Sequence, residues 1–483
     1  MTPPASGSRG SSILPFKFGL GDLIALRSVI IYYLHSIMNF VLRFVIFCSL
    51  FSSIGSFALG KPNLIYIMVD DLGYGDLSSF GQKMFTTPNI DRLAKEGRTF
   101  TDYHSGNTVC RPSRLALWTG IDPSHAPITG NAPYAMQNSD LTVAELLRKA
   151  GYTTGGVGKW AMFNGKEGHP NDHGFDFWMG YLNQSNAHNF YPPHLWRNRE
   201  QVSLEGNLAG PTHDPYRGRI ANGRQTYSHD VMTEEALVFI RENSSNPFLL
   251  HVHWTIPHAN NEGGRVWQDG MEVPSYGEFE DRDWPNPEKG FAAMITHMDR
   301  DVGRIMDLLK EEGIDENTMV IFTSDNGPHH EGNHDHAFFD SNGPLKGYKR
   351  DLYEGGIRVP MIARWPAKIE KGSQSAFPSA FWDWLPTACE LAGVEVPNHV
   401  DGTSLLPALM GKPEKRLSPL IWKYKESRGE KIAIRLGKWK AIQNALDADW
   451  ELYDLSTDIG EANNLASGNP DLLAGLIKLL EDI

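Results

Sequence analysis

From Pro62 onward, the chain alternates apolar runs of strand length with segments of helical pattern, and polar residues follow the apolar runs. The first run, 63–69, reads Asn-Leu-Ile-Tyr-Ile-Met-Val, as expected for a strand buried on both faces of a parallel sheet. It ends at Asp70 and Asp71. The alternation predicts an α/β fold with a mostly parallel central sheet flanked by helices.

Other predicted strands also end at polar residues. Open α/β sheets place their ligands at the carboxyl ends of their strands, so these residues are candidates for one shared site. The predicted strands and the residues that follow them are 152–157 before Gly158 and Lys159, 248–255 before His258, and 319–323 before Asp325 and Asn326.

Capping signals and apolar periodicity predict the helices. Thr87 and Pro88 begin one that ends at Gly97, and Thr142 with Glu145 forms a capping box for another. Further helices are predicted at 229–242, 291–309 and 383–392. Near the C-terminus, short antiparallel strands at 420–424, 432–436, 439–443 and 451–453 precede a helix at 470–483, which predicts a small α+β subdomain.

Three segments are predicted: a leader at 1–59, a catalytic domain at 60–412 and a C-terminal subdomain at 413–483. The leader carries an apolar stretch from about Val29 to Leu59. Within 38–58 it has the features of a secretory signal peptide with cleavage near Ala58, which predicts a secreted or periplasmic protein with no stable membrane span after cleavage. The alternative is an uncleaved anchor helix.

Charge and cysteine usage narrow the class of ligand. A net charge of −13 argues against nucleic acid as a partner, because phosphates require a basic surface. An anionic substrate would instead be held by a local pocket of Arg, Lys and metal. Cys48 lies in the leader and Cys389 in a predicted helix, so no disulfide framework is indicated.

The third cysteine, Cys110, lies in a distinctive setting. We expect it just ahead of a short helix that opens with Pro112, where free N–H groups attract anions. Arg111 and Arg114 add positive charge, so the pKa of the Cys110 thiol is expected to be depressed. The alternative is a small buried cysteine beside a turn.

The pattern Cys110-x-Pro112-Ser113-Arg114, followed by Thr119-Gly120, resembles the defining motif of the type I, formylglycine-dependent sulfatases. The resemblance, which is to the arylsulfatase-like branch of the alkaline phosphatase superfamily, implies that a maturing enzyme oxidises Cys110 to formylglycine. It implies an alkaline-phosphatase-like fold with a small C-terminal antiparallel sheet. By the same resemblance, the hydrated aldehyde supplies one hydroxyl to attack sulfur, and loss of the other hydroxyl's proton expels sulfate.

Four oxygen-bearing residues follow two predicted strands: Asp70, Asp71, Asp325 and Asn326. On their own they are either solvated turns or hard ligands suited to calcium or magnesium. The resemblance implies that they bind one calcium ion, with modified Cys110 as a further ligand.

The resemblance also implies roles for basic residues. Arg114 and Lys159 match positions that fix the nucleophile and neutralise charge, and Lys349, four residues before Tyr353, matches the sulfate-binding lysine, with Lys346 as the alternative. For Arg114 and Lys159, the other interpretation is a cation at the surface. His258 matches the histidine that contacts the sulfate and the leaving oxygen, and it is the candidate general acid because imidazole titrates near working pH.

One position departs from the family pattern. Many sulfatases have a histidine where this chain has Ala161, so a hydrogen bond to the nucleophile is in doubt. His188 is a candidate substitute and a further substrate-binding residue. The histidine-rich segment 329–336 could bind zinc, but it lacks a closed set of ligands and is interpreted as a polar loop bordering the active site.

Together these features predict a calcium-dependent sulfuric ester hydrolase of the arylsulfatase type, acting on a sulfated saccharide or an aryl sulfate. Two alternatives remain open. One is a phosphatase or phosphonate monoester hydrolase of the same superfamily, and the other is a pseudoenzyme that binds sulfated glycans without turnover.

Overall fold

The computed structural model describes Met38 and residues 60–208, 219–412, 415–427 and 429–481. The chain divides into two units, Met1–Leu59 and Gly60–Ile483, and the second is described below. Except for Met38, the predicted leader and its signal peptide lie outside the described residues. Among the residues that are described, no helix has both the length and the apolar character needed to cross a membrane.

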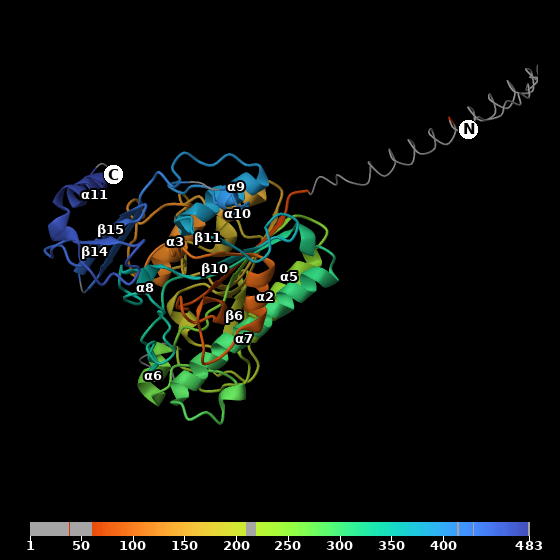
Figure 1. Cartoon of the computed structure of the whole chain (residues 1–483). Helices are drawn as coiled ribbons and strands as arrows, with labels where there is room; N and C mark the ends of the chain where they lie inside the picture. Colours follow the sequence, from red (N-terminus) through yellow and green to blue (C-terminus); the bar gives the residue numbers. More distant parts are fainter. Residues whose placement is uncertain (1–37, 39–59, 209–218, 413–414, 428, 482–483) are drawn as a thin grey trace, which may run out of the picture. The chain divides into compact units, whose positions relative to one another are not determined.

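A ten-stranded mixed sheet forms the centre of this unit (Figure 1). Its five middle strands are parallel to one another, and antiparallel strands lie on both sides of them. The predicted α/β fold with a mostly parallel sheet is therefore confirmed. In spatial order the strands are β11 (Ser373–Ser375), β2 (Arg98–Phe100), β10 (Met361–Arg364), β9 (Thr318–Ser324), β1 (Asn63–Val69), β8 (Phe248–His253), β4 (Thr153–Lys159), β5 (Phe177–Tyr181), β6 (His194–Arg197) and β7 (Glu200–Ser203).

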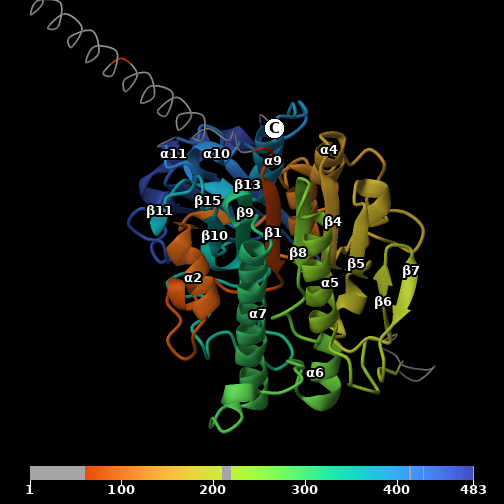
Figure 2. The ribbon, with the colours of Figure 1, turned by 90° about the vertical axis from the view of Figure 1, so that its right-hand side faces the viewer.

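Helices cover both faces of the sheet. Figure 2 shows α2 (Pro88–Glu96), α5 (Ser228–Asn243) and α7 (Asn286–Glu311) in front of it. Side chains of α3 (Cys110–Thr119), α4 (Val143–Lys149), α9 (Trp384–Ala392) and α10 (Leu406–Leu409) pack on the other face. Strand β1 feeds both cores, because successive side chains of a strand point to opposite faces. Its Ile65, Ile67 and Val69 join one core, and Leu64, Tyr66 and Met68 join the other.

Local sequence signals fix several of these elements. The predicted capping box forms at α4, where Glu145 N–H donates to Thr142 Oγ1 (3.1 Å) and Thr142 N–H donates to Glu145 Oε2 (2.9 Å). The apolar residues predicted for 291–309 are buried in α7, which extends further at both ends. Shorter helices are α6 (Asn261–Trp267), α8 (Glu354–Ile357), η1 (Ser78–Phe80), η2 (Pro170–His173), η3 (Ser185–His188), η4 (Gly277–Phe279), η5 (Asp315–Asn317), η6 (Phe381–Asp383) and η7 (Ala466–Gly468).

The predicted C-terminal antiparallel sheet is present. It consists of β13 (Leu420–Glu426), β14 (Gly429–Leu436), β15 (Trp439–Gln443) and β16 (Glu451–Asp454), and it precedes α11 (Pro470–Glu481). A separate pair of short strands, β3 (Tyr103–His104) and β12 (Ser379–Ala380), is parallel. The boundary predicted at 412/413 stays a prediction.

Buried ion pairs join the C-terminal sheet to α8 and to the segment that follows β2. Lys440 Nζ in β15 donates to Glu354 Oε1 (2.8 Å), and Arg435 in β14 donates to both carboxylate oxygens of Asp102 (2.6 Å each). Trp422 Nε1 in β13 donates to the carbonyl of Ser105 (3.1 Å). The C-terminal sheet therefore contacts the segment that leads into Cys110.

Candidate active site

The carboxyl ends of four neighbouring parallel strands bring the predicted site residues together. Asp70 and Asp71 follow β1, Asp325 follows β9, Lys159 ends β4, and His258 lies five residues beyond the end of β8. Asp71 has a φ of 67°, a left-handed conformation that aspartate tolerates better than most residues. Its backbone N–H donates to Asp325 Oδ1 (3.1 Å), which links the ends of β1 and β9.

Cys110 is the first residue of α3, and all of α3 is buried. The expectation that it precedes a helix opening with Pro112 is off by two residues, because extended Val109 is the N-cap and the helix begins at Cys110. The Cys110 Sγ atom lies 3.2 Å from Asp70 Oδ1 and 3.9 Å from Asp71 Oδ1. The helix therefore delivers Cys110 onto the carboxylates that follow β1.

The expected depression of the Cys110 pKa is wrong. Burial raises the pKa of this thiol well above its usual range, and the charges of Asp325 and Asp70 raise it further. The Arg111 guanidinium donates to the carbonyls of Ala161 (3.1 Å) and Asn131 (2.6 Å). The expected pKa took account only of charges close to Cys110 in sequence, whereas the acidic groups follow strands β1 and β9.

Each of three buried carboxylates is paired with a cation. Lys159 Nζ donates to Asp70 Oδ2 (2.6 Å), and Lys349 Nζ donates to Asp71 Oδ2 (2.7 Å). The Nε and Nη2 atoms of Arg114 donate to Asp325 Oδ2 at 3.1 and 2.8 Å. The structure thus gathers Arg114, Lys159 and Lys349 at one point, and all three are buried.

The paired carboxylates differ in the direction of their pKa shifts. Burial raises the pKa of Asp70, but Lys159 and Arg114 outweigh it and hold this pKa well below its usual range. Burial and the charge of Asp70 instead raise the pKa of Asp325 to about 7, despite Arg114. The negative charge of Asp70 therefore makes ionisation of Asp325 unfavourable, even with Arg114 beside it.

The donor set fits a divalent cation. Asn326 Nδ2 donates to Asp71 Oδ1 (2.6 Å), while its Oδ1 is buried and has no protein partner among the described residues. One ligand atom each from Asp70, Asp71, Cys110 and His258 lies within 4.8 Å of the others. An orphaned amide oxygen beside crowded carboxylate oxygens is the arrangement that a hard cation such as calcium or magnesium would satisfy.

His258 lies at the edge of this cluster. Lys349 Nζ is 3.2 Å from its Nε2 atom, and its Nδ1 atom is 2.5 Å from the carbonyl oxygen of Ala259. An ammonium group can only donate, so Nε2 is the acceptor and Nδ1 carries the proton. Burial and the Lys349 charge lower the pKa of His258 to about 3. The expectation that this imidazole titrates near working pH is therefore wrong, and His258 is neutral.

His188, from η3, stacks on His258 with the ring centroids 4.7 Å apart and an interplanar angle of 22°. Its Nδ1 atom lies 3.1 Å from Glu262 Oε2. His188 therefore contacts the site by stacking on the His258 ring. Lys346 does not, because its ammonium donates to the carbonyl of Glu461 (3.1 Å) and lies over the Tyr353 ring (3.9 Å). Of the two candidate lysines, the geometry favours Lys349.

Sequence reasoning missed several residues that hold the site. Ser113 Oγ donates to the Asp325 carbonyl (2.6 Å) and accepts from Gly106 N–H (3.0 Å), which ties α3 to the end of β9. His253 Nδ1 lies 3.5 Å from Arg114 Nη1. His253 lies near the end of the predicted strand 248–255, and this position could have indicated a site residue. Glu331, within the histidine-rich segment, accepts from Lys349 Nζ (3.0 Å).

The histidine-rich segment lies in a loop between β9 and α8. Its two buried imidazoles have partners elsewhere: His329 Nε2 lies 3.1 Å from the Pro257 carbonyl, and His334 Nδ1 lies 2.6 Å from Glu288 Oε2. Its Glu331 contacts Lys349. The segment is thus a polar loop that borders the candidate active site.

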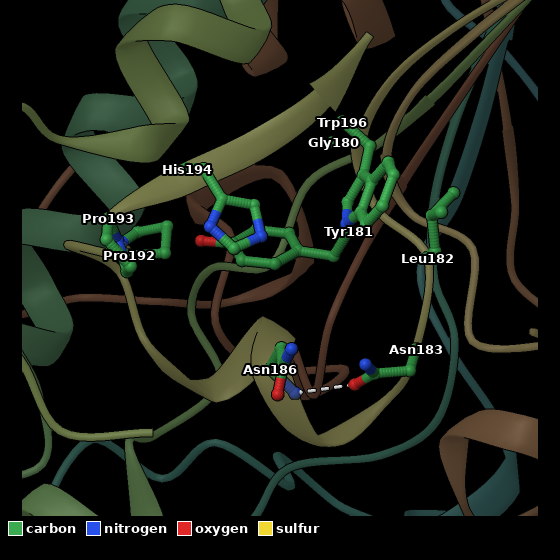
Figure 3. A pocket seen from close by; sticks show the side chains of 9 residues that line it. All are labelled: Gly180, Tyr181, Leu182, Asn183, Asn186, Pro192, Pro193, His194 and Trp196. Carbon is green, nitrogen blue, oxygen red and sulfur yellow. Dashed lines mark hydrogen bonds between the residues drawn. The ribbon is translucent and has the colours of Figure 1, made fainter. Parts of the chain in front are cut away.

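A cavity of about 120 Å³ lies beyond the end of β5. Figure 3 shows His194 and Trp196 on one side of it and Asn183 and Asn186 on the other. Asn186 belongs to η3, the same short turn that carries His188. Trp196 is half-buried. Among the other aromatic residues near this loop, Trp178 and Tyr191 are buried in the hydrophobic core.

The chain matches known families over most of its length. It matches the Sulfatase family model over residues 62–394, and the model for the C-terminal region of N-sulphoglucosamine sulphohydrolase over residues 335–481. It is 31% identical to N-acetylgalactosamine-6-sulfatase of Mus musculus over 447 residues, which cover 86% of this chain and 79% of the relative. It is 30% identical to N-acetylgalactosamine-6-O-sulfatase of Bacteroides thetaiotaomicron over 495 residues, covering 88% and 93%.

The solved structures agree. The crystal structure of Ps i-CgsB superimposes with a TM-score of 0.75 at 28% identity, covering 87% of this chain and 92% of that one. Fold and strand-end site define a hydrolase of the alkaline phosphatase superfamily. The family match is more specific, and the chain belongs to the sulfatase family. Its relatives are sulfatases, which hydrolyse sulfate esters, and so this protein is a sulfuric ester hydrolase.

Proposed function

We propose that this protein hydrolyses sulfate esters of saccharides with the help of one calcium ion and a formylglycine made from Cys110. The observation that carries the proposal is the convergence of Cys110, Asp70 and Asp71 at the strand ends, with Sγ 3.2 Å from Asp70 Oδ1. Cys110 is the unmodified precursor here, and its Sγ atom stands where the hydroxyl of the matured side chain would lie.

Asp70, Asp71, Asp325 and Asn326 would hold the ion, with the side chain of matured Cys110 beside them. A bound divalent cation polarises the S–O bonds of a sulfate and lowers the pKa of a nearby hydroxyl. Lys159 and Lys349, both buried and 2.6–2.7 Å from carboxylates, would bind the sulfate oxygens. Arg114 fixes Asp325 through two hydrogen bonds and so holds one wall of the site.

The substrate to test first is an N-acetylgalactosamine 6-sulfate, because relatives from mammals and from Bacteroides thetaiotaomicron carry that activity in their names. A structure of Ps i-CgsB, 28% identical, is a complex with k-i-k-neocarrahexaose, another saccharide. Sulfated saccharides therefore rank ahead of simple aryl sulfates as the physiological class. Secretion or a periplasmic location, directed by the predicted signal peptide within 38–58, belongs to the same proposal.

Sulfate release tests this function. The full chain, produced together with a formylglycine-generating enzyme, should release sulfate from N-acetylgalactosamine 6-sulfate and from an aryl sulfate. It should release far less phosphate from the corresponding aryl phosphate. The fold alone does not separate these classes, because a phosphonate monoester hydrolase also superimposes, with a TM-score of 0.61 at 21% identity. Preference for the phosphate ester would favour that alternative, and binding without release would favour a pseudoenzyme.

His258→Ala should harm sulfated sugars far more than an activated aryl sulfate. The Lys349 ammonium and the Nε2 atom of His258 lie 3.2 Å apart and together hold a proton that a departing sugar alcohol needs. An acidic phenol leaves without that proton. We therefore expect the loss in kcat/KM to be greater for the sugar by about 10²-fold, as measured by steady-state kinetics on both substrates.

Lys349→Ala separates the two roles open to Lys349: equal losses for both substrates would indicate sulfate binding, and a greater loss for the sugar would indicate a share in proton transfer. Exposed His399 is a matched control, and His399→Ala should leave both rates unchanged. Equal losses for the two substrates in His258→Ala would reassign His258 from proton transfer to sulfate binding.

A further inference from the structure

A cleft of about 480 Å³ lies beside the candidate active site. Its volume falls in the range of roughly 300–1,000 Å³ that is typical of small-molecule sites, but such sites are usually lined by apolar side chains. Here every described lining residue is polar, charged or glycine: Asn261, Gly264, Arg265, Gln268, Glu331, Gly332, Asn333 and Arg350. A ligand that suits this lining must be polar over most of its surface.

Glu331 connects the cleft to the sulfate-binding side of the site. One carboxylate oxygen, Oε2, accepts from Lys349 Nζ (3.0 Å) and from Asn261 Nδ2 (3.2 Å), and it lies 3.8 Å from His258 Nε2. The other, Oε1, accepts from Arg350 Nη1 (2.7 Å). A group in the cleft that reaches Glu331 is therefore one side chain away from Lys349 and His258.

The backbone at Arg350 has an unusual conformation, which allows Lys349 and Arg350 to contact Glu331 together. Its φ is 80°, in the left-handed region that arginine rarely adopts. The Arg350 N–H donates to the carbonyl (3.1 Å) and the hydroxyl (2.9 Å) of Thr108, and its own carbonyl accepts from Lys431 Nζ (2.9 Å). Consecutive residues Lys349 and Arg350 consequently grip both oxygens of Glu331. Backbone strain of this kind persists where surrounding contacts impose it, and it concentrates at functional sites.

The charges in the cleft specify the ligand further. Lys349 and Arg350 neutralise Glu331, which leaves its carboxylate able to accept a hydroxyl but unsuited to an anion. Arg265 is exposed at the cleft and forms no ion pair with any described residue. A guanidinium without a carboxylate partner is a ready site for a sulfate or a carboxylate group. Among the described residues that line the cleft, the charged ones are the cations Arg265 and Arg350 and the anion Glu331.

We propose that this cleft binds the sugar residue next to the one that carries the scissile sulfate ester, with Glu331 accepting one of its hydroxyls and Arg265 binding a second anionic group on the glycan. This inference rests on the proposed sulfatase function and deepens it. It makes the preferred substrate an oligosaccharide with acidic groups on neighbouring residues. A simple aryl sulfate or a sulfated monosaccharide would leave the cleft empty.

Arg265→Gln tests the proposal in the matured full chain. The probes are a disaccharide sulfated on both residues, the corresponding sulfated monosaccharide and p-nitrophenyl sulfate. For the disaccharide, kcat/KM should fall by about tenfold or more, mainly through KM, because a charge-assisted contact to bound substrate is lost. The other two probes should change less than twofold. Added salt should erode the wild-type preference for the disaccharide, since the Arg265 contact is exposed.

Arg241→Gln is the matched control, because Arg241 is an exposed arginine in the last turn of α5, which leads into the amino end of β8. It should leave all three probes unchanged. The proposal is overturned if wild type uses the monosaccharide as efficiently as the disaccharide, or if Arg265→Gln alters all probes alike or none of them.

A binding measurement separates this proposal from the proposed function. Unmatured protein, which retains the Cys110 thiol, can be titrated with the doubly sulfated disaccharide by calorimetry. Weaker binding in Arg265→Gln than in wild type supports the cleft even if the matured chain releases no sulfate from any probe, a result that would refute the hydrolase function alone. Sulfate release from the monosaccharide, together with unchanged disaccharide binding in Arg265→Gln, would refute the cleft alone.

Discussion

Cys110→Ser should abolish sulfate turnover while leaving sulfate binding largely intact. Serine cannot be oxidised to the aldehyde by the same maturation, and its single hydroxyl would stop at a covalent sulfate ester. Loss of a nucleophile that acts with its whole site costs on the order of 10⁴-fold or more in kcat. Lys159 and Lys349 are bound to carboxylates rather than to Cys110, so the sulfate-binding cations should keep their places. Release of inorganic sulfate and binding of a sulfated saccharide measure the two effects.

The matched control is Cys389→Ser, which makes the same atomic change at a buried thiol in α9, within the hydrophobic core. It should keep its turnover. Mass spectrometry of the wild-type peptide around Cys110 should show that the sulfur atom and two hydrogen atoms of the thiol form are replaced by one oxygen atom. A fully active preparation in which the peptide retains the thiol would refute the role of formylglycine.

Asp325→Ala should destabilise the fold and remove activity together. It removes the carboxylate to which buried Arg114 donates twice and leaves the guanidinium beside Asp70 Oδ2, 3.4 Å from Nη2. Breaking a buried ion pair costs about 3–5 kcal/mol. It also deletes one of the proposed calcium ligands. We expect the free energy of unfolding in urea to fall by that amount, and we expect metal affinity and sulfate release to be lost as well.

Asp325→Asn separates the two effects, because it keeps the size of the side chain and an oxygen donor but removes the charge. Exposed Asp283 supplies the surface control, and Asp283→Ala should change stability by no more than about 0.5 kcal/mol. If wild type stays active after verified removal of all bound metal, the four-oxygen site does not hold a required ion.

The strand ends were predictable because burial leaves a strong mark on sequence. An apolar run such as 63–69 is typical of a strand inside a sheet, and polar residues that directly follow it, such as Asp70 and Asp71, are then expected at the end of that strand. The sequence does not specify the spatial order of the strands. That order places β9, β1, β8 and β4 side by side and so determines which polar residues meet.

Electrostatic properties were less predictable, because they depend on residues far apart in the chain. The pKa of Cys110 is raised by burial and by Asp325, which is more than two hundred positions away, so a local view of Arg111 and the helix start gave the wrong sign. The left-handed backbone at Arg350 has the same origin, because it depends on Thr108 and Lys431. No residue near Glu331 signals that it bridges two adjacent cations.

The buried ion pairs of the C-terminal sheet limit how members of this family could recombine. Lys440 and Arg435 are paired with Glu354 and Asp102, which lie outside the C-terminal sheet. A C-terminal sheet grafted from a relative would therefore need matching acidic residues in the recipient protein. A mismatch would leave charged side chains buried without a partner of opposite charge. The same graft would disturb the Ser105 carbonyl that Trp422 holds, five residues before Cys110. The nucleophile and the C-terminal sheet therefore depend on each other, although more than three hundred positions separate Cys110 from β13.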